Sequence, residues 1–211
     1  NMEVNELLTK ATSGDLASIE TVAESYFRGK NGFDEDNDQA LIWYQKALEI
    51  DPNNKIALTG IGSIYYKGYG VPVDKDKGLA FYLKGADVGS GKSAARLGDH
   101  FKELQDTQCI SWYEKAFSLG EAAAAYELYR LYADGEFVAV DTAKQLEWLE
   151  KGAEANNSDC QLAFACEYLP NGNCEQDYSL ALKWMQAAAE NGSGVAMTNL
   201  AIMYTNGDGV E

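Results

Sequence analysis

The sequence predicts an all-α protein built from stacked helix pairs, because two aromatic series alternate along its 211 residues. Neighbouring members of one series are 31 to 39 residues apart. The first series contains Tyr26, Tyr65, Phe101, Tyr132, Tyr168 and Tyr204. Each residue of the second series begins a string similar to Trp-Tyr-x-Lys-Ala. These residues are Trp43, Phe81, Trp112, Trp148 and Trp184. Apolar residues around them recur at helical spacing, so each repeat is expected to hold a first helix and a second helix.

Changes in repeat length fall in the connections between these helices. The first-helix aromatic precedes the second-helix aromatic by 16 or 17 residues, except from Phe101 to Trp112, where the separation is 11. The next first-helix aromatic follows after 20 residues, except from Trp43 to Tyr65, where it follows after 22. Stacked helix pairs tolerate such insertions and deletions in loops, so the third repeat is expected to have lost five loop residues.

The second helices have matching start and stop signals. Aspartate accepts hydrogen bonds from the free amides of a first helical turn, and small residues tolerate the left-handed conformation after a last turn. The predicted N-caps are Asp36, Asp74, Asp141 and Asp177, with Gln105 at this position in the shortened third repeat. The predicted stop residues are Asp51, Gly89, Gly120, Asn156 and Gly192.

The first helices have a small residue three positions before their aromatic. A small side chain at this position lets a neighbouring helix approach closely. The residues concerned are Ala23, Gly62, Gly98, Ala165 and Ala201. Tyr129 breaks the pattern in the fourth repeat.

These strings resemble the Sel1-like repeat, a relative of the tetratricopeptide repeat. Residues 61–71 read Ile-Gly-Ser-Ile-Tyr-Tyr-Lys-Gly-Tyr-Gly-Val, and residues 74–86 read Asp-Lys-Asp-Lys-Gly-Leu-Ala-Phe-Tyr-Leu-Lys-Gly-Ala. Residues 196–210 match the same pattern, whereas residues 47–54 are closer to a tetratricopeptide ending, which makes the first repeat a hybrid. The third repeat lacks the Gly-x-Gly-Val loop, and the fifth reads Leu-Pro-Asn-Gly-Asn-Cys there, so these two loops are expected to differ in shape.

The resemblance implies a right-handed α-solenoid of stacked antiparallel helix pairs, whose first helices line a concave groove. One solenoid would span residues 1–211, with about five full repeats, an N-terminal cap helix over residues 3–12 and a C-terminal half repeat. The approximate repeats are 15–54, 55–91, 92–120, 121–157, 158–192 and the partial 193–211.

Composition argues against several classes of function. Seventeen Lys and Arg against 33 Asp and Glu give a net charge of −16, which repels nucleic-acid backbones and anionic membrane surfaces. No apolar stretch approaches the ~18 residues of a membrane-spanning helix, so no membrane insertion is expected. Residues 3–10 have neither the basic nor the apolar region of a secretory leader, so we expect none, and Asn1 before Met2 is typical of a tag remnant. We therefore expect a cytoplasmic protein.

Side chains with catalytic or metal-binding potential are few and scattered. His100 is the single histidine, and no nucleophile, base and orienting group form a recognisable set, so we expect no enzyme, no metal and no cofactor. Cys160 and Cys166 are expected to pack as small apolar groups, and a disulfide between Cys166 and Cys174 is a weaker alternative.

Two segments imitate ligand-binding motifs. Residues 89–93, Gly-Ser-Gly-Lys-Ser, lack the glycine and the preceding strand of a phosphate-binding loop. Residues 34–38 resemble the start of a calcium loop, but Gln39 and Gln45 occupy positions that require Gly and Glu. Neither segment therefore predicts a ligand.

The groove positions of the related tetratricopeptide repeat indicate where a partner would bind. The transferred residues are Glu20, Glu24, Phe27, Arg28, Thr59, Ser63, Tyr66, Lys67, Asp99, Lys102, Tyr126 and Arg130. They mix aromatic groups with both charge signs, which suits an extended peptide, although each could instead be merely solvated. The predicted function is a non-enzymatic scaffold or adaptor that binds a protein or peptide partner on the concave face.

The main alternative is an assembly subunit that makes contacts through the solenoid ends or the convex surface. The sequence ends after a first helix, so Leu200, Ile202, Met203 and Tyr204 are expected to lack part of their cover. We therefore expect either a piece of a longer protein or an end covered by another chain, including by self-association.

Overall fold

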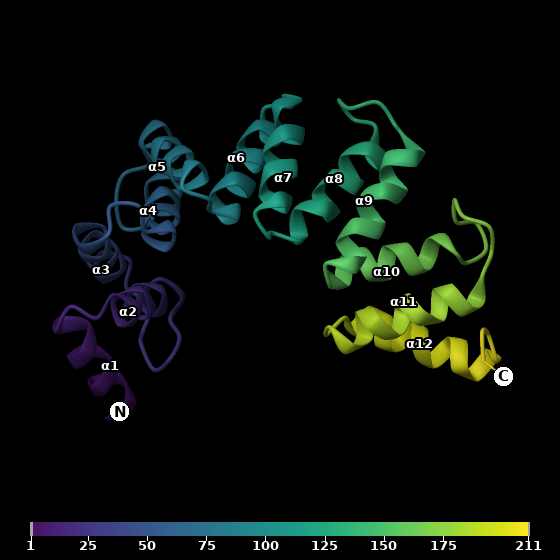
Figure 1. Cartoon of the computed structure of the whole chain (residues 1–211), viewed down its shortest axis with the longest axis horizontal. Helices are drawn as coiled ribbons and strands as arrows, with labels where there is room; N and C mark the ends of the chain where they lie inside the picture. The colour runs from purple at the N-terminus through teal and green to yellow at the C-terminus, as the bar shows by residue number, and fades with distance from the viewer. Residues whose placement is uncertain (1, 211) are drawn as a thin grey trace. The chain divides into compact units, whose positions relative to one another are not determined.

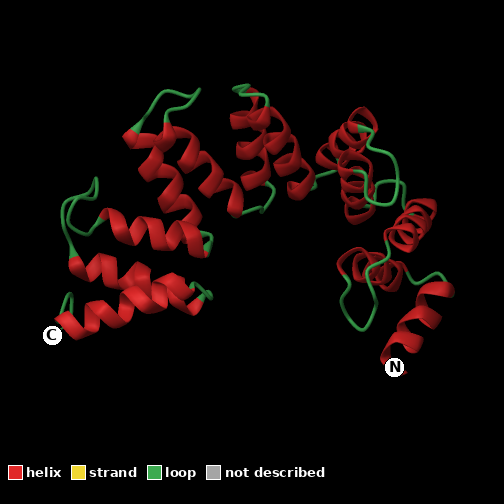
Figure 2. Ribbon diagram, turned by 180° about the vertical axis from the view of Figure 1, so that it is seen from behind, coloured by secondary structure: helices red, strands yellow, loops and turns green. Residues whose placement is uncertain are grey.

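The computed structural model describes residues 2–210, which form helices joined by loops and contain no strand (Figure 2). The helices are α1 (Met2–Thr12), α2 (Leu16–Arg28), α3 (Asn37–Ile50), α4 (Lys55–Lys67), α5 (Lys75–Asp87), α6 (Gly91–Glu103), α7 (Gln108–Ser118), α8 (Ala123–Asp134), α9 (Thr142–Glu154), α10 (Ser158–Glu167), α11 (Tyr178–Glu190) and α12 (Gly194–Asn206). The prediction of an all-α fold is confirmed.

The described residues divide into two compact units, residues 2–97 and residues 98–210. In the first unit, α2 packs against α3 and α4 against α5 (Figure 1). In the second unit, α8 packs against α9 and α10 against α11, and α11 also contacts α12. Each unit is thus a stack of adjacent helix pairs, the arrangement of an α-solenoid.

The predicted aspartate caps are confirmed. Each accepts a hydrogen bond from the backbone amide three residues later, at 2.9–3.1 Å. These caps are Asp36, Asp74, Asp141 and Asp177. Four of the five predicted stop residues have the expected positive φ, namely Gly89, Gly120, Asn156 and Gly192. Asp51 instead has extended backbone, and its carboxylate accepts the amide of Asn53 within the turn.

The prediction that Gln105 caps a helix start is wrong. Gln105 has φ +52° and its amide bonds to the carbonyl of Lys102, so it closes the end of α6. Thr107 precedes α7 without a side-chain cap, while Asp106 accepts the amide of Gln108 at 2.9 Å. With five loop residues missing, the chain reverses at once, and Gln105 takes the left-handed turn position.

The core lies between the helices of each pair. In the first unit, α2, α3 and α4 bury Val22, Tyr44 and Ile61 in one cluster, and Leu7 and Leu8 of α1 pack against it. This placement of α1 agrees with its expected role as a cap. In the second unit, Met185 of α11 is fully buried in a cluster that also contains residues of α10 and α12.

Two of the small first-helix residues, Gly62 and Gly98, lie under aromatic rings of the second helix, which agrees with the predicted close approach of neighbouring helices. A Cβ on Gly62 would lie 2.6 Å from the Tyr82 ring, and one on Gly98 would lie 2.6 Å from the Tyr113 ring. These rings therefore rest directly on helix backbone, and a glycine is the residue that leaves room for them.

Replacing Gly62 with alanine is expected to lower the free energy of unfolding by about 1–2 kcal/mol. Overpacking against Tyr82 costs about 1–3 kcal/mol, and the better helix propensity of alanine returns up to about 1 kcal/mol. Urea denaturation followed by circular dichroism measures the change. Gly194→Ala is the control, because no atom lies within 4 Å of a Cβ at Gly194. Equal destabilisation by both variants would contradict the packing explanation.

Candidate functional site

The predicted partner-binding residues occupy four recurring positions of the first helices, which we call the first-helix face. The first unit brings eight of them onto two contacting helices: Glu20, Glu24, Phe27 and Arg28 on α2, with Thr59, Ser63, Tyr66 and Lys67 on α4. The second unit holds the other four: Asp99 and Lys102 on α6, with Tyr126 and Arg130 on α8.

Glu24 is held in place by the second helix of its own repeat. Its Oε1 accepts a hydrogen bond from the hydroxyl of Tyr44 at 2.7 Å, and its Oε2 accepts one from Nε of Arg28 at 3.2 Å. Tyr44 is fully buried, and burial followed by the charge of Glu24 raises the pKa of its hydroxyl well above the ordinary value. The neutral tyrosine therefore remains a hydrogen-bond donor that orients the carboxylate.

The next two repeats also have a tyrosine at the position of Tyr44. One hydrogen bond of 2.9 Å joins the hydroxyl groups of Tyr82 and Ser63, and the hydroxyl of Tyr113 donates to Oδ1 of Asp99 at 2.7 Å. Burial and the bond to Asp99 raise the pKa of Tyr113. In three successive repeats, a buried tyrosine thus orients a polar side chain of the first-helix face.

The fourth and fifth repeats lack this tyrosine. Their second helices carry Leu149 and Met185 at the position of Tyr44, both fully buried. The corresponding first-helix positions hold Arg130 and Cys166. The repeats that lack the tyrosine hydroxyl therefore also lack the first-helix carboxylate or hydroxyl that it contacts in the first three repeats.

Two predicted residues make contacts inside the fold. Oε1 of Glu20 accepts a hydrogen bond of 2.7 Å from the amide of Asn54, whose own side chain caps α4. Oγ1 of Thr59 lies 2.9 Å from Oγ of Ser90 and 2.6 Å from Oγ of Ser93. These contacts join the first helices to neighbouring elements.

The aromatic residues predicted to bind a partner are less accessible than their positions in the repeat suggest. Tyr66 is only 7% exposed and its ring lies 5.9 Å from that of Tyr82, so the structure places it in the core. Phe27 is partly buried and meets Tyr69 edge to face at 5.7 Å. Sequence reasoning missed Tyr69, which is 42% exposed, because it follows the helix stop at Gly68. The sequence feature that could have identified Tyr69 is its position between two turn glycines, Gly68 and Gly70.

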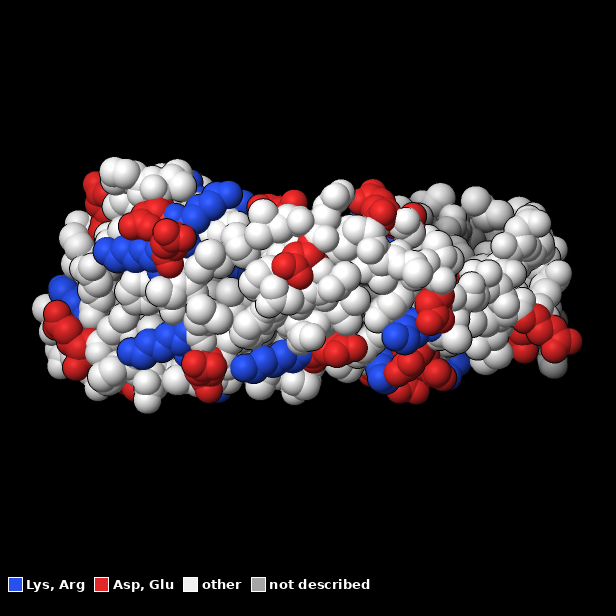
Figure 3. Space-filling model, turned by 90° about the horizontal axis from the view of Figure 1, so that it is seen from above, with Lys and Arg blue, Asp and Glu red and all other residues white. Residues whose placement is uncertain are grey.

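Two basic residues of this face form ion pairs in the second unit. Nζ of Lys102 lies 2.6 Å from Oε2 of Glu127, and Nη2 of Arg130 lies 3.3 Å from Oδ2 of Asp134. The ring of Tyr126 packs 5.6 Å from that of Tyr129. Figure 3 shows acidic and basic side chains dispersed among uncharged residues on the side of the molecule that it displays.

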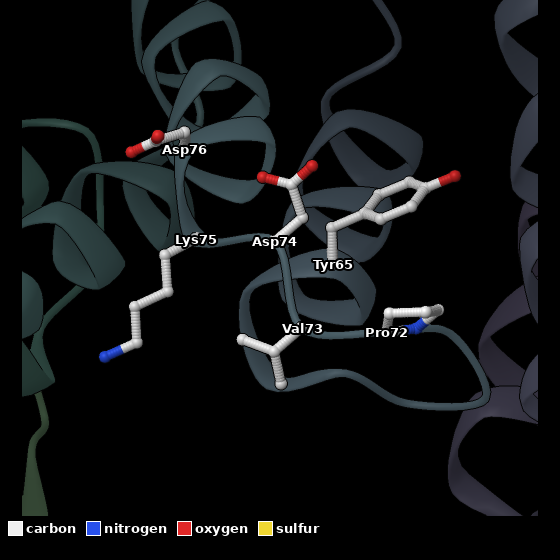
Figure 4. A pocket seen from close by; sticks show the side chains of 6 residues that line it. All are labelled: Tyr65, Pro72, Val73, Asp74, Lys75 and Asp76. Carbon is white, nitrogen blue, oxygen red and sulfur yellow. The ribbon is translucent and has the colours of Figure 1, made fainter.

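A surface hollow lies beside the loop between α4 and α5. It is lined by Tyr65, Pro72, Val73, Asp74, Lys75 and Asp76. The side chains of Tyr65 and Lys75 point in opposite directions (Figure 4), and the carboxylate of Asp74 is occupied as the α5 cap. These groups do not converge on one point, so the hollow offers no set of ligands for a small molecule.

The cysteines are all free thiols. Cys160 is buried, as predicted, and burial raises its pKa to about 12. Cys166 is exposed, so the prediction that it packs inside is wrong: the first-helix face turns it outward. It also forms no disulfide with Cys174.

Other features that would indicate chemistry are sparse. His100 packs beside the ring of Phe101 at 5.2 Å. Among residues 2–210, no three His, Cys, Asp or Glu side chains are grouped in a way that could hold a metal ion. Within the same range, none of the helices has the length and apolar character needed to cross a membrane.

Comparison with known families identifies both repeat types seen in the sequence. The Sel1 repeat matches residues 55–90, 92–121, 122–157, 159–193 and 194–211. The TPR repeat matches residues 35–68, a range that includes the tetratricopeptide-like ending of the first repeat.

Two curated proteins align over part of the chain. Anaphase-promoting complex subunit 3 of Schizosaccharomyces pombe is 32% identical over 105 residues, which cover 46% of this chain and 15% of that protein. An uncharacterised protein of Neisseria meningitidis is 26% identical over 155 residues, which cover 72% of this chain and 32% of that protein. The chain thus spans at most about a third of these relatives.

Solved structures show the same architecture. A Sel1 repeat protein from Oxalobacter formigenes superposes with a TM-score of 0.76 at 25% identity, covering 92% of this chain and 80% of that one. A protective antigen of uropathogenic Escherichia coli with an SLR fold gives a TM-score of 0.69 at 25% identity, covering 97% and 44%. Because Sel1 repeats match most of its residues, this chain belongs to the Sel1 repeat family, within the TPR-like superfamily.

Proposed function

We propose that this chain is a non-enzymatic scaffold that binds a protein or peptide partner on its first-helix face. Folds built from Sel1 and TPR repeats generally serve as protein interaction scaffolds. The observation that carries the proposal is the hydrogen bond between a buried tyrosine hydroxyl and a first-helix side chain in three successive repeats. Burying three hydroxyl groups in this way sets polar side chains in fixed positions at the surface.

Such fixed side chains favour the binding of a peptide. Association costs free energy when side chains of the interface lose rotational freedom, about 0.5–1.5 kcal/mol for each long side chain. Glu24 and Asp99 have already lost part of this freedom, because Tyr44 and Tyr113 hold one oxygen of each carboxylate. An incoming backbone or side chain therefore meets acceptors that are oriented in advance.

Site-specific photo-crosslinking tests the face. A photoreactive phenylalanine analogue at Ser63 is expected to capture the partner in cells that express the protein, and mass spectrometry identifies it. The matched control places the analogue at Leu83, which lies on second helix α5 of the same unit and is exposed. Equal or stronger capture through Leu83 would contradict binding on the first-helix face.

Self-association through α12 is a second candidate function, supported by a separate observation. Val195, Met197, Ile202 and Tyr204 of α12 are exposed, whereas Met203, expected to be partly uncovered, is buried. Val195 and Ile202 lie on one side of α12, and Met197 and Tyr204 lie on the other. Exposed apolar residues gathered on one helix in this way are typical of a surface that contacts another protein.

The chain is then expected to form dimers at high concentration, and Ile202→Glu is expected to abolish them. Light scattering coupled to size exclusion, over a range of protein concentrations, measures the mass. Leu83→Glu is the control, since Leu83 is an exposed apolar residue outside α12. A monomer at every concentration would exclude this function.

A further inference from the structure

We propose that the first unit binds a basic side chain of the partner, arginine in preference to a neutral residue, on a subsite formed by Glu20, Glu24, Phe27 and Tyr69. This inference rests on the proposed function and specifies the chemistry that its first-helix face recognises. We call these four residues the cation subsite. The occupant is a segment of a partner protein that carries an arginine or lysine flanked by apolar residues.

Helix geometry and ring contacts bring the four residues together. Glu20, Glu24 and Phe27 are spaced four and three residues apart on α2, so they lie on one side of that helix. Tyr69 comes from the loop after α4, and its ring meets that of Phe27 edge to face. Glu24 keeps 25% of its side chain exposed, and Tyr69 is 42% exposed. A side chain approaching from solvent can therefore reach both a carboxylate and an aromatic ring.

The subsite is electrostatically prepared for a positive charge. Two carboxylates one helical turn apart repel each other, and each is anchored from inside the fold: Glu20 by Asn54 and Glu24 by Tyr44. Phe27 and Tyr69 lie at the C-terminal ends of α2 and α4, where the helix dipoles are negative. Aromatic faces also attract cations. The carboxylates, the helix dipoles and the aromatic faces thus all favour a positive charge at the cation subsite.

A partner arginine would compete with Arg28 for Glu24. The bond from Nε of Arg28 to Oε2 of Glu24 is 3.2 Å long, and 53% of the arginine side chain is exposed. Exposed ion pairs within one helix are weak because water screens them. Arg28 reaches Glu24 through Nε alone, whereas a partner arginine can present two parallel N–H donors to the carboxylate and can cover Phe27 and Tyr69 with its stem.

The second unit does not share this chemistry. On α8, the positions equivalent to Glu24 and Phe27 hold Arg130 and Ala133. On α6, Asp99 keeps the carboxylate of the Glu24 position, but Lys102 occupies the position of Phe27. Each of these two helices therefore has a cation of the chain itself at one of the two positions that α2 fills with a carboxylate and an aromatic ring. The preference for a basic side chain is expected in the first unit alone.

Nuclear magnetic resonance titration of the full chain tests the subsite. The probe is the peptide acetyl-Ala-Ala-Leu-Arg-Leu-Ala-Ala-amide, compared with the same peptide in which neutral citrulline replaces arginine. At low salt, millimolar arginine peptide is expected to shift the amide resonances of Glu24, Phe27 and Tyr69 and to bind about tenfold more tightly than the citrulline peptide. The difference in affinity between the two peptides is expected to shrink at about 0.5 M salt, because salt screens the charge of the arginine.

Three variants separate the contributions. Glu24→Gln is expected to remove the preference for arginine, Tyr69→Ala to weaken both peptides, and Arg28→Ala to strengthen the arginine peptide several-fold by freeing Glu24. Glu49→Gln, an exposed carboxylate on α3, is the control for net charge. Equal binding of the two peptides, or no shifts on α2, would overturn the cation subsite. Capture of a partner through Ser63 would in that case leave the proposed function standing, whereas its loss would remove both.

Discussion

Above about pH 10, the free energy of unfolding is expected to fall steeply, because Tyr44 and Tyr113 resist ionisation while the chain is folded. Both side chains are buried beside a carboxylate, which raises both pKa values well above 10. In the unfolded chain, each tyrosine ionises near pH 10. The stabilisation is therefore complete below pH 10 and is lost as the pH rises toward the folded pKa.

The expected slope is about 1.4 kcal/mol per pH unit for each of these tyrosines. Urea denaturation at closely spaced pH values from 8 to 11.5 measures it. Tyr113→Phe is expected to lower stability by about 1–3 kcal/mol at pH 8, since Asp99 loses a buried donor. The gap between this variant and the parent chain is expected to narrow by about 1.4 kcal/mol per unit above pH 10.

Tyr204→Phe is the control, because Tyr204 is exposed and its hydroxyl accepts a hydrogen bond from the neutral side chain of Gln186. It is expected to leave the slope of stability against pH unchanged. A parent chain whose stability stays constant between pH 9.5 and pH 11.5 would show that these hydroxyl groups ionise freely. The account of tyrosines that orient the first-helix face would then fail.

Replacing Leu149 with alanine is expected to lower the free energy of unfolding by about 2–5 kcal/mol. Leu149 is fully buried on α9, at the position where the first three repeats have a tyrosine. Removing its side chain loses apolar burial and leaves a cavity that the surrounding helices fill incompletely.

Urea denaturation monitored by circular dichroism measures this loss. Leu104→Ala is the matched control, since Leu104 is 62% exposed and its truncation is expected to cost less than about 0.5 kcal/mol. Similar costs at the two leucines would show that position 149 is not part of a packed core.

The local elements of the fold followed from the sequence. Asp36 and Asp177 identify helix starts because a cap acts through amides only three residues away. Gly62 and Gly98 indicate close helix contacts because their spacing from the aromatic series repeats. Gln105 shows where this reasoning stops: a shortened loop changed its role from helix start to helix end.

The candidate site followed from the sequence only in part. The repeat register places Tyr66 and Glu24 on the same side of the first helices, but the structure buries one and leaves the other reachable. Tyr69 lies outside the register, in a loop that returns to α2. The pairing of Tyr113 with Asp99 is visible in the sequence as two polar residues, but their contact depends on how α7 packs on α6.

The sequence by itself determined that this chain is a repeated all-α protein, where most of its second helices begin, and which residues belong to one helical side. These features depend on hydrogen bonds and spacings within a few residues. The tertiary structure decided which side chains of the first-helix face are accessible, which are held by buried tyrosines, and that Cys166 is exposed. Exposure and orientation depend on how helices from different repeat segments pack against each other, and spacing along the chain does not specify that packing.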